Sequence, residues 1–259
     1  MNSTMLHLFV LLILSLGFAS GQRVAVIGDW GSDTPLRAQV AEALRTAHAA
    51  QPFDLLATLG DNFYPSGVPV QRFLDELPKV KIYPAFGNHD IPALAQQLKL
   101  FGLEASYYTF KQGNVQFFML NSEDFSKAQQ AWLESSLKAS VASWKVVALH
   151  RPLYSSGLHG GSRSLRVAIE PLLIRYKVNL VLAGHDHSYE RLESNGIAHI
   201  VSGGGGAWTR GFGVVKKESL VRRQGAHFLV LEATENQLAV SAYAPSGEVW
   251  DRLVLTSRP

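Results

Sequence analysis

Short apolar runs that end in small polar clusters recur through the first two thirds of the chain. Residues 23–27, 53–60, 80–87, 144–150 and 178–185 are aliphatic or β-branched, which predicts buried strands. Residues 34–51, 127–140 and 162–178 instead show apolar positions at helical spacing, with Thr34 and Pro35 suited to a helix start. Strands that alternate with helices predict a parallel sheet with crossover connections.

The pattern changes in the middle of the chain and again after residue 197. Residues 106–122 predict a hairpin around Gln112, Gly113 and Asn114. Strand-like runs then dominate at 197–203, 227–233, 237–244 and 248–257, which predicts an antiparallel meander at the end of the chain. Two packed sheets with helices outside would accommodate both halves.

Composition limits the possible classes of protein. The chain has 259 residues, 47% hydrophobic and 17% charged, without a linker or repeat, so we expect one globular domain over residues 22–259. The net charge of +3 is compatible with an anionic small-molecule substrate and too weak to indicate nucleic-acid binding. The absence of cysteine excludes disulfides, thiolate metal sites and a cysteine nucleophile.

The N-terminus has the form of a secretory signal. An apolar run over residues 8–18 precedes Ala19 and Gly21, which predicts a signal peptide at 1–21 with cleavage before Gln22. No lysine or arginine precedes the run, so an uncleaved membrane anchor is the alternative. We therefore expect an exported protein, periplasmic or secreted, with no stable membrane association after cleavage.

Polar residues gather where the predicted strands end. The clusters fall at 28–31, 60–64, 87–90, 148–150 and 183–187. Because ligand sites of parallel sheets lie at the carboxyl ends of strands, these clusters are expected to converge. Such oxygen and nitrogen ligands suit two first-row divalent or trivalent metals, which can clamp the oxygens of a phosphoryl displacement. The candidates are Asp29, Asp61, Tyr64, Asn88, His150, His185 and His187.

Each candidate taken alone also has a purely structural interpretation. A Gly-Asp pair after a strand is often a turn, and His150 could be a buried histidine with satisfied hydrogen bonds. Asp29 could cap the following helix, although Thr34 competes for that role. Tyr64 precedes a proline, where an aromatic ring often only packs against its loop. The recurrence of five clusters in one chain favours a metal site.

The order of the five clusters resembles a known family. Gly-Asp-x-Gly, Gly-Asp-x-x-Tyr, Gly-Asn-His-Asp, Val-x-x-His and Gly-His-x-His, within residues 28–187, resemble the calcineurin-like metallophosphoesterases. The tyrosine of the second block makes the chain similar to the purple acid phosphatases in their small, tartrate-resistant form. That resemblance implies an α/β fold: a four-layer α/β/β/α metallophosphoesterase sandwich with two mixed sheets.

The same resemblance implies a metal ligand set. Iron(III) would be held by Asp29, Tyr64 and His187, and Asp61 would be shared by both metals. The second metal, Fe(II), Zn(II) or Mn(II), would be held by the remaining three candidates, which are Asn88, His150 and His185.

Further residues have expected roles around the metals. His89 resembles the family's histidine that contacts the substrate phosphate or protonates the leaving group. His159, nine residues after His150, is a second candidate of this kind or an exposed loop histidine. By side-chain alternation, Asp186 is expected to point away from the metals. Asp90 is expected to orient His89 or cap the next turn.

The resulting prediction is a di-metal acid phosphatase. It would hydrolyse small phosphomonoesters to inorganic phosphate by in-line attack of a metal-bound hydroxide. A phosphodiesterase or nucleotidase of the same superfamily is the first alternative, and a non-catalytic binding protein on this scaffold is the second. The glycine run within 201–208 is expected to border the metal pocket, and the basic segment 214–223 is either a solvated face or an anion-attracting rim.

Overall fold

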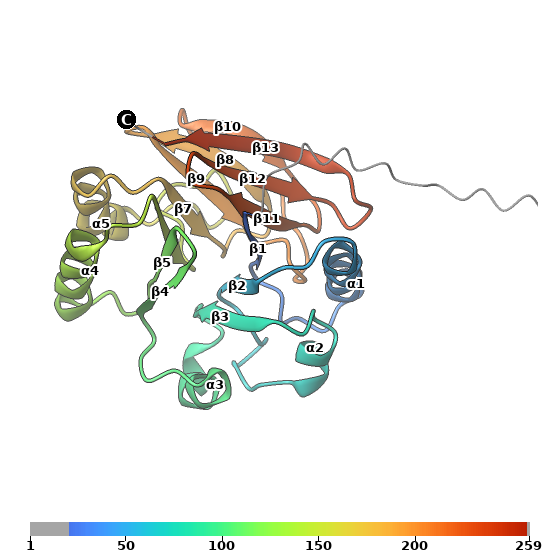
Figure 1. Cartoon of the computed structure of the whole chain (residues 1–259). Helices are drawn as coiled ribbons and strands as arrows, with labels where there is room; N and C mark the ends of the chain where they lie inside the picture. Colours follow the sequence, from blue (N-terminus) through green and yellow to red (C-terminus); the bar gives the residue numbers. More distant parts are fainter. Residues whose placement is uncertain (1–20, 258–259) are drawn as a thin grey trace, which may run out of the picture.

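Two mixed β-sheets form the centre of the protein, as the computed structural model of residues 21–257 shows (Figure 1). The first sheet has the order β13-β12-β11-β1-β2-β3 and the second β10-β8-β9-β7-β6-β5-β4. The predicted signal peptide at 1–21 lies outside the described residues except for Gly21. No helix in the described part of the chain is long and apolar enough to cross a membrane.

The first sheet joins a parallel half to an antiparallel half. Strands β1 (Gln22–Ile27), β2 (Leu55–Leu59) and β3 (Lys81–Ala85) run parallel, as the early apolar runs predict. Strand β11 (Phe228–Ala233) pairs antiparallel with β1, and β12 (Gln237–Tyr243) and β13 (Val249–Thr256) complete the predicted meander.

The second sheet has a parallel core with a hairpin at one edge. Strands β5 (Val115–Met119), β6 (Trp144–Leu149), β7 (Leu180–Ala183) and β9 (Ile197–Ser202) are parallel. Strand β4 (Tyr108–Gln112) pairs with β5 in the predicted hairpin, where Gly113 takes a positive φ of 56°. Strands β8 (Tyr189–Ser194) and β10 (Ser219–Arg223) complete the antiparallel edge.

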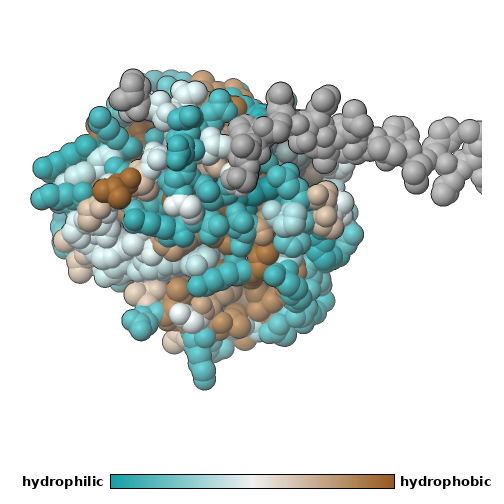
Figure 2. Space-filling model, viewed as in Figure 1, coloured by the Kyte–Doolittle hydropathy of each residue, from teal (hydrophilic) through white to brown (hydrophobic). Residues whose placement is uncertain are grey.

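Three apolar clusters separate four layers. Val26, Ala57, Val146 and Leu180 belong to the cluster between the two sheets. Helix α1 (Pro35–Ala50) and the short α2 (Gln71–Asp75) cover the outer face of the first sheet, and α4 (Lys127–Ala139) and α5 (Arg163–Arg175) cover that of the second. The predicted four-layer α/β/β/α sandwich is therefore confirmed. On the face seen in Figure 2 the surface is mostly hydrophilic.

Local sequence signals set several element boundaries correctly. Thr34 caps α1 by accepting from the Arg37 amide, and Pro35 is the first helical residue. The expectation that all strands after residue 197 form one meander was wrong for residues 197–203, since β9 lies in the second sheet, parallel to β7. Elements without a predicted counterpart are α2, η1 (Ile91–Ala93), α3 (Leu94–Phe101), β8 and β10.

Candidate metal centre

The seven candidate ligands all follow strands and meet where the two sheets present their carboxyl ends. Asp29 follows β1, Asp61 and Tyr64 follow β2, and Asn88 follows β3 in the first sheet. His150 follows β6, and His185 and His187 follow β7 in the second. Asp29 and His187, which are far apart in the chain, are therefore neighbours in the fold.

Asp29, Tyr64 and His187 form one compact group. The Tyr64 hydroxyl lies 3.2 Å from Asp29 Oδ1 and 3.2 Å from His187 Nε2. His187 Nε2 lies 3.4 Å from the same Asp29 oxygen. The three atoms therefore converge on one point, as ligands of a shared cation would.

Asn88, His150 and His185 form a second group. His150 Nε2 lies 3.2 Å from Asn88 Oδ1 and 3.1 Å from His185 Nδ1. His185 and His187 thus belong to different groups, as the family resemblance implies.

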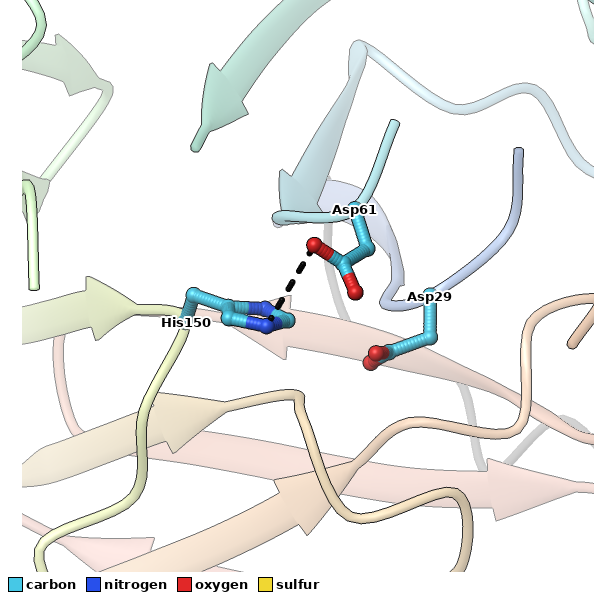
Figure 3. Close-up of side chains that lie close together, drawn as sticks. All are labelled: Asp29, Asp61 and His150. Carbon is cyan, nitrogen blue, oxygen red and sulfur yellow. Dashed lines mark ion pairs between the residues drawn. The ribbon is translucent and has the colours of Figure 1, made fainter. Parts of the chain in front are cut away.

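Asp61 lies between the two groups. Its Oδ1 is 3.5 Å from His150 Nε2, and the side chain also interacts with Tyr64 of the first group. Figure 3 shows Asp29, Asp61 and His150, whose ligand atoms all lie within 4.8 Å of one another. All three residues are buried. Because Asp61 contacts both His150 of one group and Tyr64 of the other, its carboxylate can be shared by two cations.

Backbone carbonyls orient two of the imidazole rings. His150 Nδ1 lies 2.9 Å from the Leu59 carbonyl, and His187 Nδ1 lies 2.9 Å from the Trp208 carbonyl. Because a carbonyl only accepts, each Nδ1 carries a proton. The lone pair of the neutral ring is then on Nε2, directed into the cluster, which is the arrangement typical of metal-binding histidines.

The electrostatics of the centre favour cations. Burial opposes protonation of His150 and His187, yet the Asp61 and Asp29 carboxylates raise the pKa of His150, and Asp29 raises that of His187. Burial, followed by the charges of Asp29 and Asp61, raises the pKa of Tyr64, so without a cation the phenol is neutral. A bound trivalent ion would reverse this preference, because cations stabilise the phenolate.

His185 has a second neighbour that the sequence did not single out. Arg151 Nη1 lies 3.0 Å from His185 Nε2, while its Nε and Nη2 bind the Glu123 carboxylate. An arginine only donates, so this contact makes Nε2 the acceptor and leaves the proton on Nδ1. Binding of a cation at Nδ1 requires the proton to move to Nε2 and Arg151 to give up this contact.

The backbone is unusual at three candidate ligands. Asp29, Asp61 and His185 have positive φ angles of 56°, 51° and 71°. Residues other than glycine rarely adopt this region, and such strain concentrates at functional sites. Gly60 and Gly87 permit close approach, because a Cβ on Gly60 would meet His150 at 2.6 Å and one on Gly87 would meet Asp61 at 2.2 Å.

A cavity of about 110 Å³ opens beside the two groups. The predicted residues His89 and His159 both line it. So does Arg210, which sequence reasoning missed because it follows a glycine run rather than a strand. Arg210 Nη1 lies 2.7 Å from His159 Nε2, and His89 Nδ1 lies 2.7 Å from the Pro65 carbonyl. Burial lowers the pKa of His159, and Arg210 lowers it further.

Two aspartates near the centre have structural contacts. Asp186 points away from the ligands, as expected, and accepts from Ser155 Oγ at 2.5 Å and the His159 amide at 2.9 Å. Asp90 neither orients His89 nor caps η1 with its side chain, so both expectations for it were wrong. Its carboxylate instead binds the loop after β2 and the side chain of Gln97.

Comparison with known proteins agrees with this geometry. The calcineurin-like phosphoesterase family matches residues 22–189, more than half of the chain. The chain belongs to that family. Human tartrate-resistant acid phosphatase type 5 is 31% identical to this phosphoesterase over 79% of this chain and 80% of the human one. Purple acid phosphatase 7 of Arabidopsis thaliana is 26% identical over 90% of this chain and 85% of its own. The protein is accordingly a phosphatase of the metallophosphoesterase class.

Solved structures share the fold of this phosphoesterase. The purple acid phosphatase PPD1 from yellow lupin seeds superposes with a TM-score of 0.82 at 22% identity, covering 92% of this chain and 54% of the lupin chain. A Plasmodium protein described as GAP50, the anchor in the inner membrane complex, has a TM-score of 0.81 at 23% identity, covering 92% of this chain and 90% of that chain. The fold therefore occurs in a protein described as an anchor as well as in phosphatases.

The residues present in this phosphoesterase fit two metal ions. Carboxylate oxygens, an amide oxygen, a phenol and three imidazoles form the donor set, which suits first-row transition metals. The buried carboxylates of Asp29 and Asp61 would repel each other with no cation between them, so the centre favours a bound cation.

Proposed function

We propose that the protein hydrolyses phosphomonoesters, releasing inorganic phosphate, with two metal ions held by the seven candidate ligands. The observation that supports this most directly is the arrangement of two three-residue groups with Asp61 between them. In this proposal Asp29, Tyr64 and His187 hold Fe(III). Asn88, His150 and His185 hold Fe(II), Zn(II) or Mn(II), and Asp61 is a ligand of both.

The two ions would polarise the phosphate and activate a water molecule for in-line displacement at phosphorus. The protein's own residues would complete the site. His89, which lines the cavity, would donate a proton to the departing alkoxide. Asp61 accepts from the His89 backbone N–H at 3.0 Å, which supports this role by holding the backbone of His89 at the site. Arg210 and His159 line the cavity, and in this proposal both would contact the phosphate oxygens, with Arg210 as a hydrogen-bond donor.

The visible absorption spectrum and metal content of the purified protein test the proposal. A phenolate bound to iron(III) absorbs visible light, so we expect a broad band, about two metals per chain including iron, and loss of the band in Tyr64→Phe. Two metals without a band would favour a colourless phosphoesterase in which Tyr64 only packs. A protein that binds no metal under any loading condition would contradict the proposal.

Substrate choice separates the proposed activity from its alternatives. We expect p-nitrophenyl phosphate to be hydrolysed much faster than bis(p-nitrophenyl) phosphate. The reverse order would favour a phosphodiesterase, and no hydrolysis of either ester by metal-loaded protein would favour a non-catalytic binding protein.

We also propose that the chain is exported and that residues 22–259 form the mature domain. Sequencing the N-terminus of the protein isolated from its native source tests this, with Gln22 as the expected first residue. Recovery of an intact residue 1 in the membrane fraction would favour the anchor instead.

A further inference from the structure

The cavity beside the candidate ligands is small relative to a whole organic substrate. Its volume is about 110 Å³, whereas cavities that enclose drug-sized ligands measure roughly 300–1,000 Å³. Five of the candidate ligands line the cavity together with His89, His159 and Arg210, so metals and a phosphate group would share this space and the alcohol part of a larger monoester would not fit. That part of the substrate must therefore lie over the surface at the cavity mouth.

Two loops form one edge of this mouth, which we call the outer rim: residues 155–161 and 208–217. Gly157 forms an isolated bridge with Phe212, and the Gly213 amide donates to the Ser156 carbonyl at 2.7 Å. The Lys216 amide donates to Ser156 Oγ at 2.8 Å. The two loops also meet where Arg210 contacts His159, so the outer rim is fixed relative to the cavity that these two side chains line.

The outer rim exposes large apolar side chains. Trp208 is 65% exposed, Leu158 62%, Val214 83% and Val215 50%. Trp208 is the one exposed tryptophan in residues 21–257. Its backbone carbonyl lies 2.9 Å from His187 Nδ1, so Trp208 is in direct contact with a candidate ligand. A methyl group on Gly213 would lie 3.9 Å from Leu158 Cδ2, which places the Val214 segment beside Leu158. Apolar side chains grouped at a cavity mouth indicate a binding surface.

Exposed apolar residues also adjoin His89. Ile91 is 39% exposed and lies two residues after His89, and Val68 is 51% exposed. Val68 follows Gly67, whose backbone packs closely against Asp90. The ring of His89 in turn lies 4.4 Å, centroid to centroid, from that of Tyr64. Exposed apolar side chains therefore adjoin both His89 and His159, the two cavity histidines that are not candidate metal ligands.

The charges of the outer rim suit an amphiphilic ligand. Arg210 carries a permanent positive charge at the cavity, and the exposed Lys216 and Lys217 follow the apolar residues. We propose that the substrate is an amphiphilic phosphomonoester, whose phosphate enters the cavity while an alkyl chain or ring of its alcohol lies over Trp208 and Leu158. This inference rests on the proposed phosphomonoesterase function and adds the substrate class.

A series of alkyl phosphates tests the inference, because ethyl, butyl and octyl alcohols are nearly equal as leaving groups. With metal-loaded protein, and below the aggregation concentration of the esters, we expect kcat/KM to rise about tenfold or more from ethyl to octyl phosphate. Trp208→Ala combined with Leu158→Ser should remove most of this rise. The backbone carbonyl that binds His187 remains in the Trp208 variant.

Val141→Ser is the matched control. Val141 is 88% exposed and precedes β6, at the end of the strand opposite His150, so its substitution should leave the chain-length dependence unchanged. Equal kcat/KM values for ethyl and octyl phosphate in the unmodified protein would overturn the inference and leave the phosphomonoesterase function intact. Hydrolysis of no phosphomonoester would overturn both.

Non-hydrolysable octylphosphonate and ethylphosphonate supply a binding readout. We expect octylphosphonate to bind about tenfold more tightly and to shift tryptophan emission to shorter wavelength, since its chain would cover the exposed Trp208 ring. Chain-length dependence that persists in the double variant would overturn the inference. Loss of binding to anionic phospholipid vesicles in that variant, with unchanged chain-length dependence, would identify the outer rim as a membrane-docking surface instead.

Discussion

The carboxylate of Asp90 accepts two hydrogen bonds from the backbone N–H of Asn62, at 2.9 Å and 3.1 Å. The same group accepts from the Phe63 amide at 3.2 Å and the Gly87 amide at 2.8 Å. It therefore ties the loop after β2, which carries Asp61 and Tyr64, to the loop that carries Asn88 and His89. Asp90 is fully buried, so water cannot replace these bonds.

We expect Asp90→Ala to destabilise the protein by about 3 kcal/mol, because several buried N–H groups lose their acceptor. Urea unfolding of the metal-free protein measures this. Asp75→Ala, which removes an exposed carboxylate on α2, is the control and should change stability by less than about 0.5 kcal/mol. Equal unfolding midpoints for the two variants would refute the role of Asp90.

Asp61→Asn should remove metal binding without disturbing the fold. Asparagine tolerates the positive φ of this residue and can still accept from the His89 amide, so the change removes mainly the charge. Outer-shell changes at metal sites typically cost about 10–100-fold in affinity, and loss of a ligand should cost at least that much. Metal analysis after dialysis and phosphatase assays check this, with Asp75→Asn as the control.

The same variant separates a metal ligand from a structural aspartate. A chelator should lower the melting temperature of the unmodified protein, because bound metal stabilises the folded state, and should leave that of Asp61→Asn unchanged. Without metal, Asp61→Asn should be no less stable than the unmodified protein, since it relieves repulsion between buried carboxylates. A strongly destabilised metal-free variant would contradict this expectation.

His89→Ala should lower kcat by about 100-fold or more on alkyl phosphates, whose leaving groups need a proton. The loss should be much smaller on p-nitrophenyl phosphate, because p-nitrophenolate departs without one. The p-nitrophenyl ester serves as the control for the alkyl esters within the same variant. Unchanged metal content of His89→Ala would exclude loss of metal as the cause of lower activity. Equal losses on both esters would show that His89 binds the phosphate rather than protonating the leaving group. His159→Ala can be tested in the same way.

His199 should make the fold sensitive to acid. It is buried beside Tyr154, and neither ring nitrogen has a hydrogen-bond partner in the described residues. Burial lowers the pKa of His199 from its ordinary 6.5 to about 4. Between these values the unfolded chain binds a proton that the folded chain does not, so stability falls as the pH decreases from about 6.5 to about 4, by up to about 3 kcal/mol.

His199→Leu should therefore reduce the loss of unfolding free energy between pH 7 and pH 4 by up to about 3 kcal/mol. Urea unfolding of the metal-free protein at both pH values measures the difference. His48→Leu, on the partly exposed surface of α1, serves as the control. A variant with the same pH dependence as the unmodified protein would show that His199 does not cause the acid sensitivity.

Short-range signals in the sequence sufficed for the buried strands and several helices. The apolar runs at 23–27 and 144–150 predict buried strands, because apolar side chains are stabilised by removal from water. Thr34 and Pro35 determine the start of α1 through local backbone geometry and capping. Strands β8 and β10 lack a continuous apolar run, because polar residues such as Glu190 and Arg222 interrupt them. Strand β8 pairs with β9 across the local turn at Asn195 and Gly196, whereas β10 pairs with β8 from about thirty residues further along the chain.

The order of residues along the chain is enough to show the chemistry available to this protein, because it specifies which polar residues end which strands, in an order that resembles one family. How those residues group depends on folding, because Tyr64 and His187 are 123 positions apart in the chain and yet the Tyr64 hydroxyl lies 3.2 Å from His187 Nε2. Arg151 and Arg210 lie at the candidate site for the same reason. Neither follows a recognisable pattern, and each acquires its role from the side chain that folding brings next to it.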